Sequence, residues 1–250
     1  MSAPIILSLE TATMAGSVWL GSGTDQLATR LGDPNVSQSA SLLQDIDDCL
    51  AEAAVKLPEV ALFACASGPG SFTGLRIGIA TLKALAASLS RPCVGIPTLQ
   101  AVAHAGGPSE ATVALLPAGR GEVFAQMFSV SGGGVATALD SAAHLSPQRI
   151  LEKYAQRRNL KWSGTGAHLQ RDILEGFAND QGIRFSFAPA EDGNLGGAVW
   201  ELSPQEFNLA RHVAALALQR FQSGAIQSPQ SLSAIYVRPS DAELNQNVVN

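Results

Sequence analysis

Short apolar runs separated by glycine and polar residues open the chain. Three of these runs have the length of strands and predict a three-stranded meander: 4–9, 16–22 and 25–31. From Ser37 the apolar residues recur every three or four positions, and this spacing predicts an amphipathic helix that ends near Lys56. The continuous apolar run at 60–66 is typical of a parallel strand that is covered on both faces.

The glycine-rich stretch SGPGSFTGLRIG, residues 67–78, follows that run and leads into a helix predicted over 72–89. It lacks the Lys-Ser/Thr pair of a nucleotide-binding P-loop, and it follows the fourth predicted strand rather than the first hairpin. We therefore interpret its first part as a tight strand-to-helix turn at the inner edge of a cleft. A strand at 92–96 and a helix at 97–105 complete the first half.

The second half follows a boundary-like segment at 105–111 and repeats this order. We predict strands at 112–119, 121–130, 135–144, 160–164 and 184–189, and helices at 146–158, 168–177 and 203–224. The last helix carries the strongest signals, with Ser203 as N-cap, Pro204 in the first turn and Glu206 completing a capping box.

Each half therefore has the order of three strands, a helix, a strand and a helix. This duplicated βββαβα unit is the architecture of the ASKHA proteins, which include actin, sugar kinases and Hsp70-type ATPases, so we predict a two-lobed α/β fold of that class. The lobes are predicted at 1–107 and 108–250, and packing of the last helix back on the first lobe is left open. By analogy with the fold, ATP would lie in the cleft between the lobes.

Composition and charge narrow the choice of function. The chain has 250 residues, of which 46% are apolar and 15% charged, and its net charge is −5. Without a strongly basic surface we do not expect it to hold a nucleic acid alone. The three cysteines lie far apart in apolar surroundings, which predicts buried thiols. We find neither a secretory signal nor an apolar run of the roughly 20 residues that span a bilayer, and we expect a cytoplasmic protein without membrane contact.

Six segments match the pattern of a known family in order and spacing. They are LSLETATMAGSVWL (7–20), ASGPGSFTGLRIGIATLKALA (66–86), VGIPTLQAVA (94–103), GEVFAQMF (121–128), GTGAHL (164–169) and AIYVRP (234–239). On these segments, which span essentially the whole chain, the sequence resembles the bacterial TsaB (YeaZ-type) family, which also carries the older label M22 glycoprotease-like. GPGSFTGLRIG is the most specific of the matching stretches.

The resemblance implies a scaffold rather than an enzyme. Members of this family look like worn-down ASKHA ATPases. They bind the catalytic subunit TsaD and, with the ATPase TsaE, support transfer of threonylcarbamoyl to N6 of the adenosine 3′ of the anticodon in ANN-reading tRNAs. The resemblance further implies a homodimer when TsaD is missing and contact with tRNA only through the complex. It implies no cofactor of the chain's own, because ATP, Mg²⁺ and the catalytic metal belong to the partners.

The alternative function is that of a small-molecule kinase or ATPase of the same fold that acts on its own. The histidines bear on the choice, because the catalytic paralogue needs two of them four apart on one helix, together with a carboxylate, to hold its metal. The four histidines lie at positions 104, 144, 168 and 212, so no two share a helical turn. We expect no metal site and no catalytic residue. A serine-protease triad is equally unsupported, because nothing ties a histidine to Ser71.

The nucleotide site of the fold is degenerate in this sequence. Glu10 stands where the family usually has aspartate, and Pro117-Ala118-Gly119 stands where it often has Asp-Ala-Arg. The histidine that often starts the first helix in the family is also absent, since NVSQSAS stands at 35–41. The small residues 164–166 could approach an adenosine, although such a run is more typical of a turn. The predicted remnants of the site are Glu10, Thr11, Gly164 and Gly166.

Two predicted helices offer a docking face. Gly74 and Gly78 lie four apart on one helix and present nearly bare backbone on one side. A glycine inside a helix costs about 0.5–1 kcal/mol relative to alanine, which indicates close approach by another element. That element is either a partner helix or the chain's own sheet. The predicted partner interface comprises Leu42, Ile46, Cys49, Gly74, Arg76, Ile77, Gly78 and Thr81.

Overall fold

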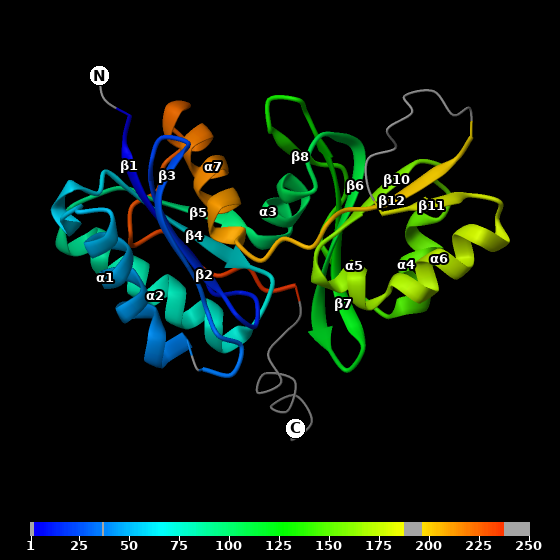
Figure 1. The fold of residues 1–250 in the computed structure, drawn as a ribbon, viewed down its shortest axis with the longest axis horizontal. Helices are drawn as coiled ribbons and strands as arrows, with labels where there is room; N and C mark the ends of the chain where they lie inside the picture. Colours follow the sequence, from blue (N-terminus) through cyan, green and yellow to red (C-terminus); the bar gives the residue numbers. More distant parts are fainter. Residues whose placement is uncertain (1–2, 37, 188–196, 238–250) are drawn as a thin grey trace, which may run out of the picture.

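Two sheets and the helices that cover them make up the computed structural model, which describes residues 3–36, 38–187 and 197–237 (Figure 1). The strands of the first sheet are β1 Ile5–Glu10, β2 Ser17–Ser22, β3 Asp25–Leu31, β4 Leu62–Gly68 and β5 Cys93–Pro97. They lie in the order β3-β2-β1-β4-β5. The hairpin pairs are antiparallel, whereas β1, β4 and β5 run parallel.

The second sheet repeats this plan. Its strands are β6 Ser109–Gly119, β7 Glu122–Val130, β8 Ala136–Ala138, β9 Ala143–Leu145, β10 Leu160–Ser163, β11 Arg184–Ser186 and β12 Val199–Leu202. The order β8-β7-β6-β10-β12 corresponds strand by strand to β3-β2-β1-β4-β5, with the same parallel and antiparallel pairs. The predicted two-lobed α/β fold of ASKHA type, built from duplicated units, is therefore confirmed.

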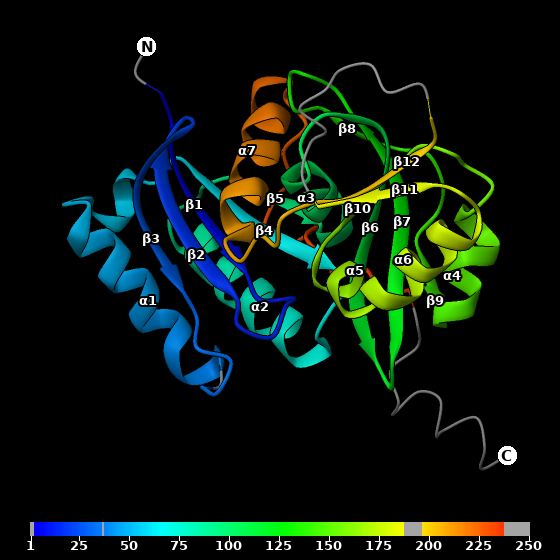
Figure 2. The same cartoon turned by 45° about the vertical axis from the view of Figure 1, so that its right-hand side comes forward.

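Helices and sheets alternate in five layers (Figures 1 and 2). Helices α1 Gln38–Glu52 and α2 Phe72–Ser88 cover the outer face of the first sheet, and a short 3₁₀ helix, η1 Leu57–Glu59, follows α1. Helices α3 Thr98–Ala105 and α7 Leu209–Gln222 lie between the two sheets. Helices α4 Pro147–Tyr154, α5 Thr165–Leu169 and α6 Arg171–Asp180 cover the outer face of the second sheet. One apolar cluster fills the space on both sides of the middle helices, and one further cluster lies beneath the outer helices of each sheet.

The middle cluster joins the lobes. It combines residues of β1, β4 and β5 with α3, α7 and the inner faces of β6 and β7. Apolar burial contributes about 25 cal/mol per Å² removed from water, so a cluster shared by both sheets favours their association. The chain crosses between the sheets twice, at 105–109 after α3 and at 203–208 before α7. Both crossings lie beside this cluster.

The predicted start of the last helix is wrong. Residues 199–202 form β12, which the sequence analysis did not predict, and the Ser203 amide donates to the Trp162 carbonyl at the end of that pairing. The chain then crosses to the first sheet, and α7 begins only at Leu209. The residues that carried the helix-capping signals, Ser203, Pro204 and Glu206, therefore lie in the crossing and not at the start of a helix.

Smaller corrections concern the ends of elements. The predicted strand at 135–144 is two short strands, β8 and β9, and the predicted helix at 168–177 is α5 and α6, which meet at Gln170. Helix α1 ends at Glu52 rather than near Lys56, because Ala54 adopts a positive φ of 52° that a helix cannot continue through. Helix α4 ends at Tyr154 rather than 158. The segments predicted at 184–189 and 234–239 extend partly outside the described residues.

The three cysteines are free and buried, as predicted. Within the described part of the chain, none of the helices combines the length and apolar character needed to cross a membrane. The division of the chain at residue 107 remains a prediction.

The start of α7 depends on one hydroxyl of the first sheet. The Ala210 amide, in the first turn of the helix, donates to the buried Ser17 Oγ of β2 at 3.0 Å. Replacement of Ser17 by alanine leaves this amide without a partner, and we expect the free energy of unfolding to fall by about 1–2 kcal/mol. Chemical denaturation measures the change. Ser22→Ala at the partly exposed other end of β2 is the matched control, and an equal loss there would contradict the prediction.

Candidate functional site

A cavity of about 1000 Å³ lies between the lobes. The first lobe contributes the β1–β2 turn and the turn from β4 into α2, and the segment at 235–237 lies against the first sheet, where the Ile235 amide donates to the Ser67 carbonyl. The second lobe contributes the end of β6, the start of α5 and the crossing at 205–207. The position of the SGPGS turn at the inner edge of this cleft agrees with the interpretation of the sequence. This is where the fold analogy would place a nucleotide, so the groups around the cavity decide what it can bind.

Glu10, at the end of β1, is fully buried and points into its own turn. One carboxylate oxygen accepts hydrogen bonds from the Ala12 and Thr13 amides, and the other accepts one from Thr13 Oγ1 at 2.6 Å. Burial raises the pKa of the Glu10 carboxyl above its usual value, while the bonds from Thr13 and Ala12 oppose that shift by favouring the charged form. The family resemblance predicted that the Glu10 carboxylate belongs to a nucleotide site. Both of its oxygens instead accept hydrogen bonds from donors of the chain itself.

Thr11 is also turned away from the cavity. It lies buried beneath α2, where a Cβ on Gly74 would overlap the Thr11 carbonyl oxygen and one on Gly78 would overlap the Thr11 hydroxyl. The element that approaches these two glycines is therefore the chain itself. Of the two alternatives for the glycine face, packing within the chain is the one that the structure shows.

On the other side of the cavity, Gly164 and Gly166 have separate roles. Gly164 precedes α5 with a φ of 96°, a conformation that favours glycine, and it lines the cavity. Gly166 lies in the first turn of α5, where a Cβ would come within 2.7–2.9 Å of the Leu115–Leu116 backbone. The short run 164–166 is therefore a helix start rather than a simple turn. Of the four predicted remnants, only Gly164 is part of the cavity wall.

The described walls of the cavity carry little charge. None of the described residues that line it is lysine or arginine, and the carboxylate on its wall is that of Glu206. Pro117, Ala118 and Gly119, which replace a family motif with two charged residues, line it with neutral groups. A phosphate group in this space would meet neither lysine nor arginine among the described residues that line it.

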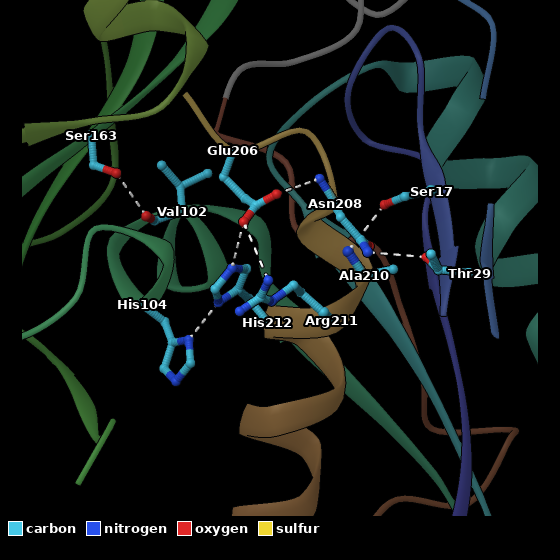
Figure 3. Close-up of polar contacts among 10 residues, drawn as sticks. All are labelled: Ser17, Thr29, Val102, His104, Ser163, Glu206, Asn208, Ala210, Arg211 and His212. Carbon is cyan, nitrogen blue, oxygen red and sulfur yellow. Dashed lines mark hydrogen bonds and ion pairs between the residues drawn. The ribbon is translucent and has the colours of Figure 1, made fainter. Parts of the chain in front are cut away.

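A chain of polar contacts spans the second crossing beside the cavity (Figure 3). The Glu206 carboxylate accepts hydrogen bonds from the Asn208 amide at 2.7 Å and from His212 Nε2 at 3.2 Å. His212 Nδ1 lies 2.8 Å from His104 Nδ1 on α3. Because His212 donates through Nε2, its Nδ1 is the acceptor when the ring is neutral, and His104 must then donate through Nδ1. All of these contacts are satisfied when both rings are neutral.

The pKa values agree with this arrangement. Burial lowers the pKa of His212 to about 4, and it also lowers the pKa of His104, with Arg211 acting in the same direction on both rings. Burial alone would raise the pKa of Glu206, but the hydrogen bonds from Asn208 and His212 outweigh it and the net pKa is lowered. From the sequence alone these histidines share no helical turn, and the cluster was not predicted. His104 and His212 are 108 positions apart, and only the shared middle layer brings them together.

The crossing is also tied to the first sheet. Asn208 Nδ2 donates to Thr29 Oγ1 at 3.0 Å, and Ser163 Oγ of β10 donates to the Val102 carbonyl of α3 at 2.9 Å (Figure 3). These bonds link residues of different lobes across the middle layer. The polar cluster therefore helps to hold the two lobes together.

The predicted interface residues fall into two groups. Five of them are buried within the first lobe and cannot form a contact surface: Leu42, Ile46, Cys49, Gly74 and Gly78. Arg76 is exposed, whereas Ile77 and Thr81 are half-buried, and Ile77 packs against the apolar cluster of the first lobe. The Arg76 guanidinium lies 3.8 Å from the centre of the Phe72 ring, which in turn contacts the Tyr236 ring. Leu43 of α1, which was not among the predicted interface residues, is 62% exposed.

No metal centre is evident in residues 3–36, 38–187 and 197–237, where no three histidine, cysteine or acidic side chains are grouped as a metal ion would require.

Known proteins of the TsaD and TsaB (YeaZ) type resemble this chain in sequence and in fold. The family model described as TsaD, tRNA N6-adenosine threonylcarbamoyltransferase, matches residues 37–219. The tRNA threonylcarbamoyladenosine biosynthesis protein TsaB of Escherichia coli is 30% identical over 155 residues, which cover 60% of this chain and 66% of that protein. The protein of the same name from Haemophilus influenzae is 35% identical over 127 residues, covering 48% of this chain and 51% of that protein. The chain thus spans slightly less than two thirds of the length of the Escherichia coli protein and about half of the length of the Haemophilus influenzae protein.

Solved structures show the same fold over nearly the whole chain. YeaZ from Pseudomonas aeruginosa superposes with a TM-score of 0.69 at 24% identity, covering 93% of this chain and 99% of that one. A second structure, of an uncharacterized protein with similarity to peptidase YEAZ from Pseudomonas aeruginosa, gives a TM-score of 0.71 at 25% identity, covering 94% of this chain and 100% of that one.

The histidine pair predicts a pH dependence of stability. The unfolded chain binds a proton at His212 near pH 6.5, but the folded chain does so only near pH 4, so stability is fully present above pH 6.5 and falls as the pH drops toward 4. We expect a loss of roughly 1–3 kcal/mol over this range. His212→Gln, which retains a donor for Glu206 but does not titrate, should flatten the slope. Chemical denaturation from pH 7.5 to 4.5 measures it. The same replacement at His144, in the second sheet, is the control, and an unchanged slope in His212→Gln would contradict the prediction.

Proposed function

Because the chain belongs to the TsaD family, whose model is described as tRNA N6-adenosine threonylcarbamoyltransferase, we propose that it takes part in making threonylcarbamoyladenosine in tRNA as a TsaB-like, non-catalytic subunit. In this role it binds a TsaD-like catalytic subunit and, with a TsaE-like ATPase, supports transfer of the threonylcarbamoyl group to N6 of the adenosine 3′ of the anticodon. It contacts tRNA through the complex, and ATP, Mg²⁺ and the catalytic metal are held by the partner subunits.

The observation that carries the non-catalytic role is the environment of Glu10. An ATPase of this fold needs a carboxylate at the end of its first strand that can face Mg²⁺ and water. Here both oxygens of that carboxylate accept hydrogen bonds from the turn that follows, and no part of the side chain reaches solvent. To serve a nucleotide, Glu10 would have to give up these donors and leave them unpartnered in a buried site.

A partner surface is available on the outer side of the first lobe. Helices α1 and α2 lie side by side there (Figures 1 and 2), and their buried residues hold them to the sheet. On these two helices Leu43, Arg76, Ala80 and Ala84 are exposed, and Ile77 and Thr81 are half-buried. We propose that this surface contacts the TsaD-like subunit, and a second copy of the chain when that subunit is missing.

The second candidate is a small-molecule kinase or ATPase that acts on its own. The cavity of about 1000 Å³ between the lobes favours it, since an enzyme of this fold would bind its substrates there. The absence of lysine and arginine from the described wall of the cavity and the inward-facing Glu10 favour the scaffold. ATP turnover by the purified chain separates the two: the scaffold predicts none above background, and appreciable turnover without a partner would support the enzyme.

The docking surface can be tested with two exposed leucines. Leu43 on α1 is 62% exposed, and Leu139 in the second lobe is 43% exposed. Leu43→Asp places a charge in the proposed interface and should weaken binding to the organism's own TsaD-like protein by about tenfold or more, a loss of about 1.4 kcal/mol. Calorimetry or co-elution measures the affinity. Leu139→Asp should bind like the wild type, and equal affinities for all three chains would refute this placement of the interface.

A further inference from the structure

The β1–β2 turn, residues 11–16, is the support on which both docking helices begin. At the start of α1, Gln38 Nε2 donates to the Thr13 carbonyl at 2.9 Å. Ahead of α2, the amide of its N-cap residue Ser71 donates to the Ala12 carbonyl at 2.7 Å. Two elements that are distant in sequence are thus attached to consecutive carbonyls of one turn.

The same turn is in direct contact with the body of α2. Gly74 and Gly78 rest on Thr11 so closely that a Cβ at either position would overlap it. A contact without free space transmits a displacement, because neither side can move without the other. A shift of the backbone at Thr11–Thr13 would therefore move the first turns of α2 and the anchor of α1 together.

Glu10 fixes the conformation of this turn. Its two oxygens accept hydrogen bonds from the Ala12 amide, the Thr13 amide and the Thr13 hydroxyl, and the side chain has no access to water. Without the carboxylate these three donors would have no partner in place, and the turn would rearrange to find new ones. The Ala12 and Thr13 carbonyls that hold the helices belong to the very residues whose amides Glu10 holds.

We propose that Glu10 is a positioning residue for the partner-binding surface: by holding the β1–β2 turn in one conformation, it sets where α1 and α2 begin relative to each other. A position that would serve a nucleotide in an active enzyme of this fold thus serves protein docking in this chain. The expected effect on partner affinity rests on the proposed function. The coupling between Glu10 and the two helices does not, because it can be measured in the isolated chain.

Four variants separate a positioning role of Glu10 from a general effect on stability. Glu10→Ala removes every acceptor, whereas Glu10→Gln keeps the shape and an acceptor oxygen for the two amides without the charge. Asp140→Ala is the matched control, because this carboxylate in the second lobe likewise accepts from a backbone amide, that of Met127, and from a hydroxyl, that of Tyr154. Thr13→Val, which deletes only the hydroxyl donor, serves as a milder version should Glu10→Ala not fold.

The first measurement uses the chain without a partner. Hydrogen exchange of the backbone amides should rise in Glu10→Ala at the N-terminal turns of both α1 and α2, and should return toward the wild-type rate in Glu10→Gln. Asp140→Ala should leave these amides unchanged. If the amides of α1 and α2 exchange at the wild-type rate in Glu10→Ala and Thr13→Val, or rise equally in Asp140→Ala, the inference is overturned. This result does not depend on whether the chain binds a TsaD-like protein.

The second measurement is affinity for the organism's own TsaD-like protein. We expect Glu10→Ala to bind about tenfold more weakly than the wild type, Thr13→Val to fall between them, and Glu10→Gln and Asp140→Ala to stay within about threefold of the wild type. Wild-type affinity in a folded Glu10→Ala would overturn the role in docking. A wild-type chain that does not bind contradicts the proposed function instead, and the exchange measurement still decides whether Glu10 positions the helices.

Discussion

A carboxylate cut off from water must find its hydrogen-bond donors inside the protein, and Glu10 finds them in the turn that follows it. That solution fixes the backbone at the end of β1, a strand held on both sides by β2 and β4. The fixed turn then holds Gln38 at the start of α1, Ser71 at the start of α2, and the side of α2 that carries Gly74 and Gly78. The glycines of α2 are explained by the same constraint, because only a residue without Cβ fits against Thr11.

The second organising feature is the middle layer, in which α3 and α7 pack against both sheets. Because α7 follows β12 in sequence but packs on the first sheet, the chain must cross between the lobes at 203–208, and its polar groups need partners along the way. Glu206, His212 and His104 supply them in a chain of hydrogen bonds that is fully satisfied with both rings neutral. The lobes are therefore joined by an apolar cluster and by a hydrogen-bond chain that runs from the second crossing through α7 to α3.

Much of the fold could be predicted from the sequence, because strand length, helical periodicity and turn residues are local signals that agreed with the tertiary structure. The exception at 203–208 shows the limit: Ser203, Pro204 and Glu206 match a capping box, but β12 pairs with β10 through residue 202, and Glu206 accepts from Asn208 and His212 instead. Gly74 and Gly78 correctly indicated a close approach, yet a glycine shows only that something comes near, and the sequence could not say that Thr11 does. The histidine pair left no local signal at all.

The demands of catalysis and of docking on this turn are opposite. An enzyme of this fold needs its first carboxylate free to take part in each cycle, and a buried carboxylate held by three donors is not free. A docking surface gains from the same rigidity, because binding a preorganised surface requires less ordering of backbone and side chains than binding a mobile one. The inward-facing Glu10, the neutral cavity wall at Pro117–Gly119 and the helices seated on the turn can thus be understood together. Each favours a fixed shape at a place where an enzyme would keep groups available for chemistry.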